Sequence, residues 1–388
     1  MKKIHLFLSV TLVCFASTVF AQEIEVGRAR YIFDEDNHTA NFKRWYGEDD
    51  NKTTLIIPDV VEYDGKQYKV TKVGSTAGNQ IYELANVVIP EGVTEIDNGA
   101  FAYCYSLKNV TIPSSVKKIG SNAFKECQEL EDIVLPDAID TIQYRTFYGC
   151  LKLRSINIPE GVKMIGPGAF YSCQKLESII LPKSITKIDE EAFAGCGSLA
   201  SVTFNNGLEA IGKGAFLECS SIESISLPKS LTNLASFSFA SCSSLESINL
   251  PDSLEEIKEA TFAECSALKK IDFPETILKI ERFAFRECAS LVKIELPRKM
   301  TKLSPCVFVG CTSISEIFIP ASIKEIGSGA FDYCRSLTDI YLYPIEPPFV
   351  NNIFDGISLD NVTAHVVNVK NYKKEYPWRN FKSVVLIQ

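Results

Sequence analysis

Cysteine recurs every 23 residues without a slip through most of the chain, and this spacing constrains the fold more than any other feature. From one cysteine to the next the unit reads C-x2-L-x2-I-x-L-P-x2-V-x2-I-x3-A-F-x2-C. A fixed period of this length predicts a solenoid to which each repeat contributes one coil. The eleven cysteines in register are Cys104, Cys127, Cys150, Cys173, Cys196, Cys219, Cys242, Cys265, Cys288, Cys311 and Cys334.

Each unit contains two apolar clusters separated by a proline. In the unit that starts at Cys150, apolar and polar residues alternate around Asn157, which predicts a short strand. Pro159 ends that strand, because proline has no N–H to donate to a neighbouring strand. The second cluster, around Ile165, predicts a turn or a second short strand. The residues around Phe170 predict a helical turn on the opposite side of the coil. One such unit is too small to bury its own apolar face, so stacking must bury it, with coils about 4.8 Å apart.

The cysteine column itself is predicted to be a structural column of buried free thiols. Such a thiol acts as a small apolar group with a weak S–H donor. An oxidising compartment permits disulfides, but stacked cysteines point in parallel directions and their number is odd. Zinc requires ligands that converge, which a straight column does not provide. We therefore expect no metal site and no cofactor.

Four segments are expected along the chain. Residues 1–21 carry two lysines, an apolar run and small residues ending at Ala21, which predicts a cleaved signal peptide. Residues 22–53 predict a β-rich N-terminal cap, and residues 54–357 a solenoid of about 13 coils. An insertion at 61–68 contains Asp64-Gly65, which is typical of a tight hairpin. Residues 358–388 predict a C-terminal cap rich in aromatic residues.

Composition excludes several classes of function. The formal net charge is −8, and loss of the two lysines of the signal peptide makes it −10. Acids and lysines are interleaved without a basic stripe, which argues against nucleic acid as a partner. After the signal peptide no apolar stretch is long enough for a transmembrane segment. Of three histidines one lies in the signal peptide, so no Ser/His/Asp or Cys/His arrangement is available and no catalytic residue is assigned.

The repeat unit, with glycine often following the second apolar cluster, closely resembles the BspA-like, or Treponema pallidum-type, class of leucine-rich repeat. The resemblance covers residues 54 to about 357, and the segment from Tyr372 to Val385 also resembles the end of such proteins in gut Bacteroidetes. It implies a leucine-rich repeat solenoid with short parallel strands in a sheet, helical turns opposite and a cap at each end. It also implies an exported protein, secreted or at the cell surface, with the periplasm as a further possibility. Some members adhere to host matrix proteins, and the family has no shared catalytic residues.

The outward column of the predicted strands changes character toward the C-terminus. Serines, threonines and asparagines give way to a mixture of rings and charges, which is typical of a binding face. Two alternatives remain open here: the two rings lie beneath the C-terminal cap, or the carboxylates, one coil apart, act as a glycosidase pair. The predicted ligand-binding residues are Asp272, Glu295, Phe318 and Tyr341, with Lys270 and Lys293 beside them.

A second candidate surface is an apolar stripe on the turn side of the solenoid. It consists of Phe237, Ala260, Phe283 and the out-of-register Cys306, all two residues before the phenylalanine of their repeats. The stripe is a contact surface for self-association, or it reflects local packing of enlarged turns. The preferred hypothesis for function is a non-catalytic adhesion protein that binds an extracellular protein or glycan, a host matrix protein among them. The alternatives are a self-assembling surface component and, least favoured, a carbohydrate-active enzyme.

Overall fold

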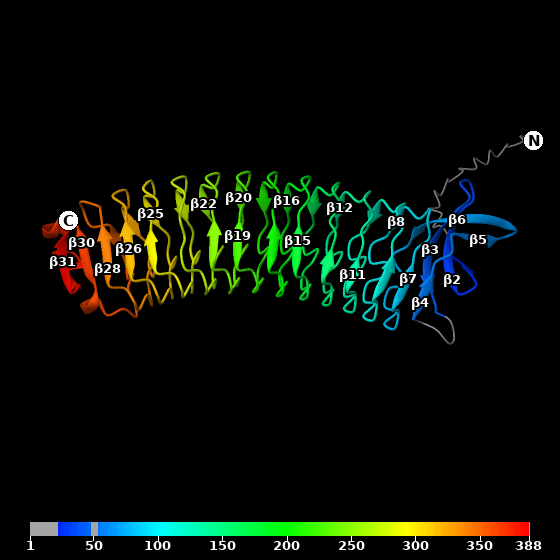
Figure 1. Ribbon diagram of the computed structural model, residues 1–388, viewed down its shortest axis with the longest axis horizontal. Helices are drawn as coiled ribbons and strands as arrows, with labels where there is room; N and C mark the ends of the chain where they lie inside the picture. The colour runs from blue at the N-terminus through cyan, green and yellow to red at the C-terminus, as the bar shows by residue number, and fades with distance from the viewer. Residues whose placement is uncertain (1–21, 48–52, 388) are drawn as a thin grey trace, which may run out of the picture.

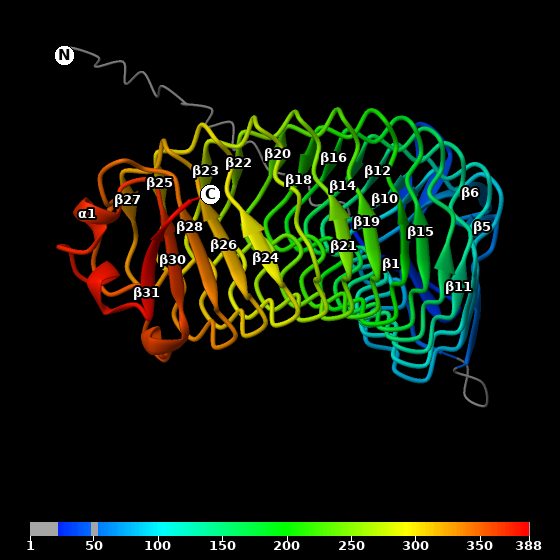
Figure 2. The same ribbon diagram turned by 60° about the vertical axis from the view of Figure 1, so that its left-hand side comes forward.

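The computed structural model describes residues 22–47 and 53–387, so the expected signal peptide lies outside the described residues. The described chain is an elongated, gently curved rod with its two ends far apart (Figure 1). Parallel strands from successive coils lie along two faces of the rod (Figure 2). The expected repeat solenoid is therefore confirmed.

The first strand of each coil lies where the alternation of apolar and polar residues predicts it. Ile179 is buried while Ser178 and Ile180 are exposed, and Ser178 pairs in parallel with Ser201 of the next coil. We call the outer surface of these strands the strand face. Its strands are β4 (Thr54–Ile56), β7 (Asn86–Val88), β9 (Asn109–Thr111), β11 (Asp132–Ile133), β13 (Ser155–Ile156), β15 (Ser178–Ile180), β17 (Ser201–Thr203), β19 (Ser224–Ser226), β21 (Ser247–Asn249), β24 (Lys293–Glu295), β26 (Glu316–Ile319), β28 (Asp339–Leu342), β30 (Thr363–Val366) and β31 (Ser383–Leu386).

A second, shorter strand follows the proline corner in most coils and also pairs in parallel with its neighbours. Its inward residue, such as Ile188, is buried. These strands are β6 (Lys66–Val73), β8 (Glu95–Ile96), β10 (Lys118–Ile119), β12 (Thr141–Ile142), β14 (Met164–Ile165), β16 (Lys187–Ile188), β18 (Ala210–Ile211), β20 (Asn233–Leu234), β22 (Glu256–Ile257), β23 (Lys279–Ile280), β25 (Lys302–Leu303), β27 (Glu325–Ile326) and β29 (Phe349–Val350).

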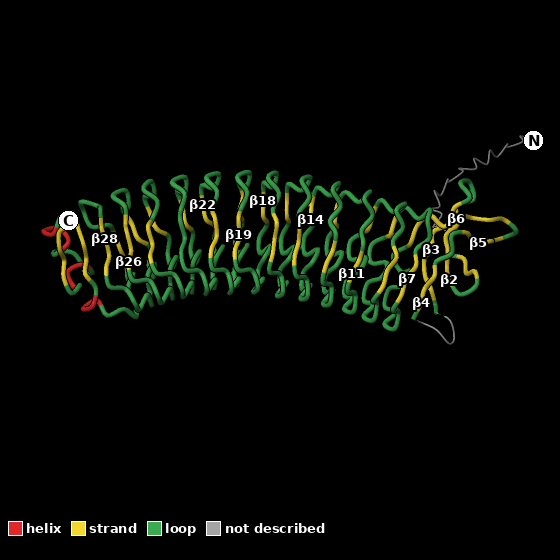
Figure 3. The backbone as a smooth tube through the Cα atoms, in the orientation of Figure 1, coloured by secondary structure: helices red, strands yellow, loops and turns green. Residues whose placement is uncertain are grey.

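The prediction of helical turns opposite the strand face is wrong. Within the described residues, helices occur only at the C-terminal end (Figure 3), as η1 (Leu359–Asn361), α1 (Val369–Tyr372) and η2 (Trp378–Asn380). In a typical coil Gly168 and Ser172 have φ of 58° and 56°, in the left-handed region, and such residues interrupt helical geometry. The N–H of Phe170 donates to the carbonyl of Ala192 in the next coil, at 2.7 Å, instead of back along its own chain. We call the outer surface of these turns the turn face.

The phenylalanines between these left-handed residues form a continuous spine inside the rod. From Phe101 to Phe354, neighbouring ring centroids are 5.2–6.0 Å apart and the rings are stacked. The cysteine column runs beside the spine, and all eleven thiols in register are fully buried. From Cys127 onward, each Sγ donates a hydrogen bond to the carbonyl of the phenylalanine 26 residues earlier, at 3.0–3.4 Å.

Both ends of the spine are covered. At the N-terminal end β1 (Ile24–Val26), β2 (Ala29–Asp34) and β3 (Thr39–Trp45) pair antiparallel, and β3 then pairs in parallel with β6. The strand β5 (Val60–Tyr63) pairs with β6 around the Asp64-Gly65 turn. At the C-terminal end, the rings of Trp378 and Phe381 pack edge-on against Phe354. These covers remove the exposed ends that a stack of coils would otherwise present.

Glycine is required where two coils approach closely. A Cβ on Gly212 would lie 2.6 Å from the backbone of Asp189 and Glu190, whereas a Cβ on Gly197 would meet only the Ser220 hydroxyl at 3.8 Å. Gly212→Ala is therefore expected to lower the free energy of unfolding by about 1–3 kcal/mol, as for other overpacked positions. Gly197→Ala is expected to be neutral or to stabilise by about 0.4–1 kcal/mol. Guanidinium chloride unfolding measures both, and equal midpoints for the two variants would contradict this account.

Candidate functional site

Three rings form a ladder at the C-terminal end of the strand face. Phe318 of β26, Tyr341 of β28 and His365 of β30 occupy paired positions in adjacent parallel strands. The Phe318 and Tyr341 centroids are 4.3 Å apart with an interplanar angle of 3°, and those of Tyr341 and His365 are 4.3 Å apart at 9°. Parallel pairing in register brings the rings together, because it places equivalent side chains directly beside one another. We call these three residues the aromatic ladder.

Charged groups hold the two ends of the ladder. The Lys293 ammonium lies 4.4 Å from the centroid of the Phe318 ring, and it also pairs with Glu295 at 2.5 Å. That carboxylate raises the pKa of Lys293. At the other end His365 Nε2 lies 2.7 Å from Asp339 Oδ1. Burial raises the pKa of Asp339, but hydrogen bonds from His365 and Thr338 outweigh it and hold the pKa below its ordinary value.

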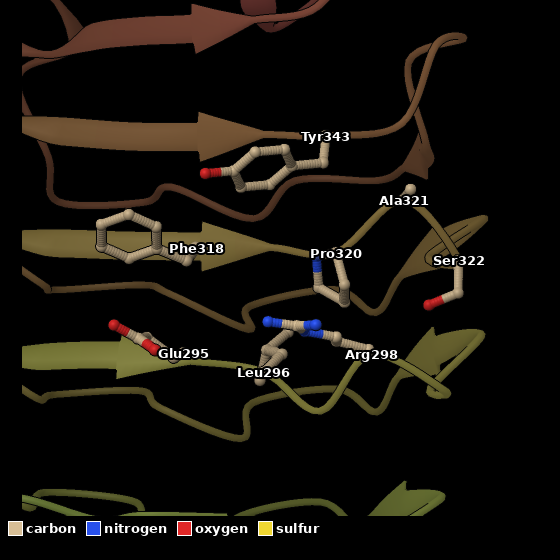
Figure 4. Close-up of a pocket in the computed structure, with 8 residues that line it drawn as sticks. All are labelled: Glu295, Leu296, Arg298, Phe318, Pro320, Ala321, Ser322 and Tyr343. Atoms are coloured by element: carbon tan, nitrogen blue, oxygen red, sulfur yellow. The ribbon is translucent and has the colours of Figure 1, made fainter. Parts of the chain in front are cut away.

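A hollow of about 550 Å³ opens beside the ladder, where β24 and β26 meet their proline corners (Figure 4). Arg298 lies between Leu296 and Pro320 in this view, and its side chain is 87% exposed. Its Nε is 3.8 Å from a carboxylate oxygen of Glu275, an exposed pair of the kind that contributes little. The lining residues are Glu295, Leu296, Arg298, Phe318, Pro320, Ala321, Ser322 and Tyr343.

The six residues predicted from the sequence lie on this part of the strand face. A second hollow, of about 350 Å³, is lined by Lys270, Asp272, Lys293 and Glu295 and shares Glu295, Leu296 and Arg298 with the first. Phe318 lines the first hollow, and Tyr341 stacks on Phe318. The C-terminal segment extends the sheet past Tyr341 through β30 and β31, so it lies beside the two rings in the sheet.

Sequence reasoning missed His365, Arg298 and Tyr343. The coil between Asp339 and its partner Thr363 is one residue longer than the period, so counting in steps of 23 passes over His365. Three prolines between Leu342 and Phe349 were the available signal of that longer coil. Arg298 and Tyr343 lie at the corners that follow the strands, outside the alternating pattern.

The carboxylates of the enzyme alternative are arranged as surface ion pairs. Asp272 pairs with Lys270 at 2.9 Å and Glu295 with Lys293, and all four side chains are exposed. Within residues 22–47 and 53–387, no group of three or more His, Cys, Asp or Glu side chains is arranged to hold a metal ion. Over the same residues no helix is long and apolar enough to cross a bilayer.

Three of the four residues of the apolar stripe, Phe237, Ala260 and Phe283, pack in one cluster on the turn face. Ala260 is 3% exposed, and the half-buried rings of Phe237 and Phe283 pack against a cluster formed by Ala260, Ala240 and Ala263. Both phenylalanines have positive φ, of 61° and 60°, which is unusual for a bulky side chain. Cys306 is partly exposed, with Sγ 3.6 Å from the Ser328 carbonyl. This packing fits the local alternative, while self-association through the stripe stays a prediction.

Comparison with known proteins gives concordant results. The family model described as BspA type Leucine rich repeat region (6 copies) matches residues 67–177, 163–282 and 256–375. The crystal structure of a leucine-rich repeat protein from Bacteroides ovatus is 27% identical, with a TM-score of 0.62, and the match covers 82% of this chain and 94% of that one. No curated protein gives a significant match.

Two further solved structures are similar. A leucine rich cell surface protein from Faecalibacterium prausnitzii is 29% identical, with a TM-score of 0.56 and coverage of 82% and 94% of the two chains. The pneumococcal vaccine antigen PcpA, at 20% identity and a TM-score of 0.53 over 95% and 99% of the two chains, shares the fold. The repeat class supports a non-catalytic repeat protein. With the family model matching most of its length, this chain belongs to the BspA-type leucine-rich repeat family.

Proposed function

We propose that this protein is an exported, non-catalytic recognition protein that binds an extracellular partner through the C-terminal part of its strand face. The aromatic ladder and the adjoining hollow carry the proposal. Elsewhere the outward column consists mainly of small polar and aliphatic residues, whereas here two rings and an arginine line a hollow, and Lys293 lines the hollow that adjoins it. Aromatic residues and arginine are the side chains most enriched at the centres of protein interfaces.

The geometry of the ladder favours a protein over a glycan. A sugar ring packs on the free face of an aromatic ring, but the stacked faces of the ladder already contact one another. Tyr341 is stacked between Phe318 and His365, the Lys293 ammonium lies 4.4 Å from the Phe318 centroid, and His365 pairs in register with Val385 of β31. The ladder instead offers ring edges, which carry partial positive charge and attract carbonyl and carboxylate oxygens.

A direct test compares two matched double variants on the same face. Phe318→Ala/Tyr341→Ala removes two rings of the ladder, and Ile180→Ala/Thr203→Ala truncates the side chains at the equivalent outward positions of β15 and β17. The probes are a panel of immobilised extracellular matrix proteins and a glycan array, with affinities measured by surface plasmon resonance. The ladder variant is expected to weaken binding at least about 30-fold, since a central aromatic contact contributes about 2 kcal/mol or more.

The control variant is expected to bind like the wild type. Both variants are expected to remain folded, because the ladder pairs contribute only about 0.5–1.5 kcal/mol each beyond their burial. Circular dichroism and thermal unfolding check this expectation. Equally weakened binding by both variants would show that the aromatic ladder is not part of the binding site. Binding confined to the glycan array would reverse the choice of ligand class, and a wild-type chain that binds neither panel would contradict the proposed function.

A further inference from the structure

Tyrosine is distributed unevenly along the solenoid, and six tyrosines gather toward its N-terminal end. Between Tyr171 and Tyr333 the chain has no tyrosine at all. The six lie within five successive coils, on the turn face and in the turn that leads from it to the next strand. Three of them are 39–55% exposed, and the other three are half-buried. They are Tyr82, Tyr103, Tyr105, Tyr144, Tyr148 and Tyr171.

Two cations join these rings into one continuous network. The Lys125 ammonium lies 5.1 Å from the Tyr103 centroid and 5.3 Å from that of Tyr148. The Arg145 guanidinium lies 4.8 Å from the Tyr144 centroid and 5.1 Å from that of Tyr148. A cation held against rings has already lost part of its side-chain freedom before a partner binds. We call the six tyrosines together with Lys125 and Arg145 the tyrosine network.

Direct contacts between rings complete the network at its two ends. Tyr82 and Tyr105 stack at 5.3 Å, and Tyr105 contacts Tyr103 edge-on at 6.3 Å. Tyr148 and Tyr171 stack at 4.8 Å. With a rise of about 4.8 Å per coil, the network is about 19 Å long from its first coil to its fifth. An extended segment of about six residues has that length, because a strand rises about 3.3 Å per residue.

Every side chain of the network has a hydrogen-bond donor that the rest of the protein does not use. A phenol has one O–H, and the ammonium and the guanidinium have several N–H groups. Among the tyrosine hydroxyls of residues 22–47 and 53–387, only those of Tyr333 and Tyr372 have a hydrogen-bond partner in the chain. Over the same residues no carboxylate pairs with Lys125 or Arg145, whereas Lys152 nearby pairs with a glutamate at 2.7 Å.

Acidic side chains border the network but leave its cations unpaired. The carboxylate of Glu126, next in sequence to Lys125, accepts a hydrogen bond from a glutamine side chain at 3.0 Å. At the other end burial raises the pKa of Tyr171, and the carboxylates of Glu191 and Glu218 raise it further. The part of the network that suits a negatively charged partner therefore lies on the N-terminal side of Tyr171.

We propose that the tyrosine network binds an extended, acidic segment of a second protein. Carboxylates accept hydrogen bonds from phenol, ammonium and guanidinium groups alike, so they match the unused donors. Tyrosine favours a protein as the partner, because it supplies a rigid contact area at little conformational cost. A sulfated glycan would need a longer row of unpaired cations than the two found here. The network belongs to the coils of β7 to β14 and the aromatic ladder to β26 to β30, near opposite ends of the rod (Figure 1), so the two binding proposals are independent.

An array of short synthetic peptides tests the class of partner. Each acidic peptide contains several Asp or Glu residues, and its counterpart has Asn or Gln at the same positions. The wild-type chain is expected to bind some acidic peptides at least about tenfold more tightly than their amide counterparts, because a charge-assisted hydrogen bond is stronger than a neutral one. Heparin is the comparison probe for a sulfated glycan.

Variants of matched charge locate the binding surface. Lys125→Gln/Arg145→Gln removes both cations of the network and is expected to weaken peptide binding at least about tenfold. Lys183→Gln/Lys229→Gln removes the same charge from two exposed lysines at proline corners outside the network. This control is expected to bind like the wild type, and circular dichroism checks that every variant is folded.

Tyr105→Phe/Tyr144→Phe removes two hydroxyls and keeps both rings, so it separates hydrogen bonding from packing. It is expected to weaken peptide binding about fivefold or more. Binding equal to that of the wild type would overturn the proposal, because the hydroxyls would then not be donors to the partner. Equal loss in the two charge variants, or no preference for acidic over amide peptides, would overturn it as well. Binding of heparin without binding of any acidic peptide would assign the cations to a sulfated glycan instead.

Discussion

Above pH 9 the free energy of unfolding of this protein is expected to fall more steeply than that of an ordinary domain of its size. The cause is the column of eleven thiols. Burial raises the pKa of every one above the ordinary value of 9.0, to about 12 for Cys104, Cys196, Cys242 and Cys334. The others are raised in the same direction.

The sign follows from which state binds the protons. Between pH 9 and the raised values the folded chain keeps its thiol protons while the unfolded chain releases them, so rising pH favours unfolding. Each thiol contributes about 1.4 kcal/mol of lost stability per pH unit in this window. Summed over the eleven thiols, a rise of about one pH unit in this window lowers the free energy of unfolding by as much as a whole protein usually has, about 5–15 kcal/mol. Below pH 9 this contribution is fully present and nearly constant.

Guanidinium chloride midpoints measured from pH 7 to 10 test this prediction, together with proton release on unfolding. The lower part of the window precedes tyrosine ionisation, for which the ordinary pKa is 10.0. Cys196→Ala/Cys242→Ala is the control, and it should reduce the number of protons released by two while leaving the fold intact. A midpoint that stays flat between pH 8.5 and 10 would show that the thiols are not buried as a column.

Phe193→Ala is expected to produce the second large effect, a loss of about 3–5 kcal/mol in the free energy of unfolding. Phe193 is fully buried at the middle of the spine, stacked on Phe170 at 5.2 Å and on Phe216 at 5.3 Å. Its removal leaves a cavity and breaks two ring contacts, each of which contributes about 0.5–1.5 kcal/mol beyond burial.

The position of the Phe193→Ala substitution also affects the cooperativity of unfolding. In a solenoid each coil contacts only its neighbours, so a weak central interface lets the two halves unfold separately. Hydrogen exchange should therefore show faster exchange in the coils around Phe193 than in those nearer the caps. Phe193→Leu is the control, with a smaller loss because it keeps most of the buried apolar volume. A sharp transition with a loss under 1 kcal/mol would contradict the account of the spine.

Much of this architecture could be predicted because every coil meets the same requirement. A residue such as Ile179 or Cys173 must point inward in each copy, and the proline must stand where lateral pairing ends. Repetition turns a weak local signal into a strong one. The period therefore indicated the solenoid, its parallel strands and its apolar interior before any coordinates.

The turns could not be predicted in the same way. The apolar residues around Phe170 resemble the start of a helix, and nothing in the sequence marks the positive φ at Arg145, Glu191 or Phe237. Glycine often signals such a conformation, but here most coils have another residue. Hydrogen bonds to the next coil hold the turn open, so the conformation depends on a neighbour 22 residues away.

Within the candidate site, the aromatic ladder likewise has one part that the sequence predicts and one part that only the tertiary structure shows. The 23-residue period was sufficient to place Phe318 beside Tyr341, since both lie in register. Only the tertiary structure added His365, because the longer coil shifts the count and pairing between β28 and β30 restores the alignment. The sequence by itself thus determined the coil, its inward columns and the face each outward residue occupies. Tertiary structure decided how coils meet, because the turn conformation, the hollow at Arg298 and the end of the ladder depend on contacts between coils.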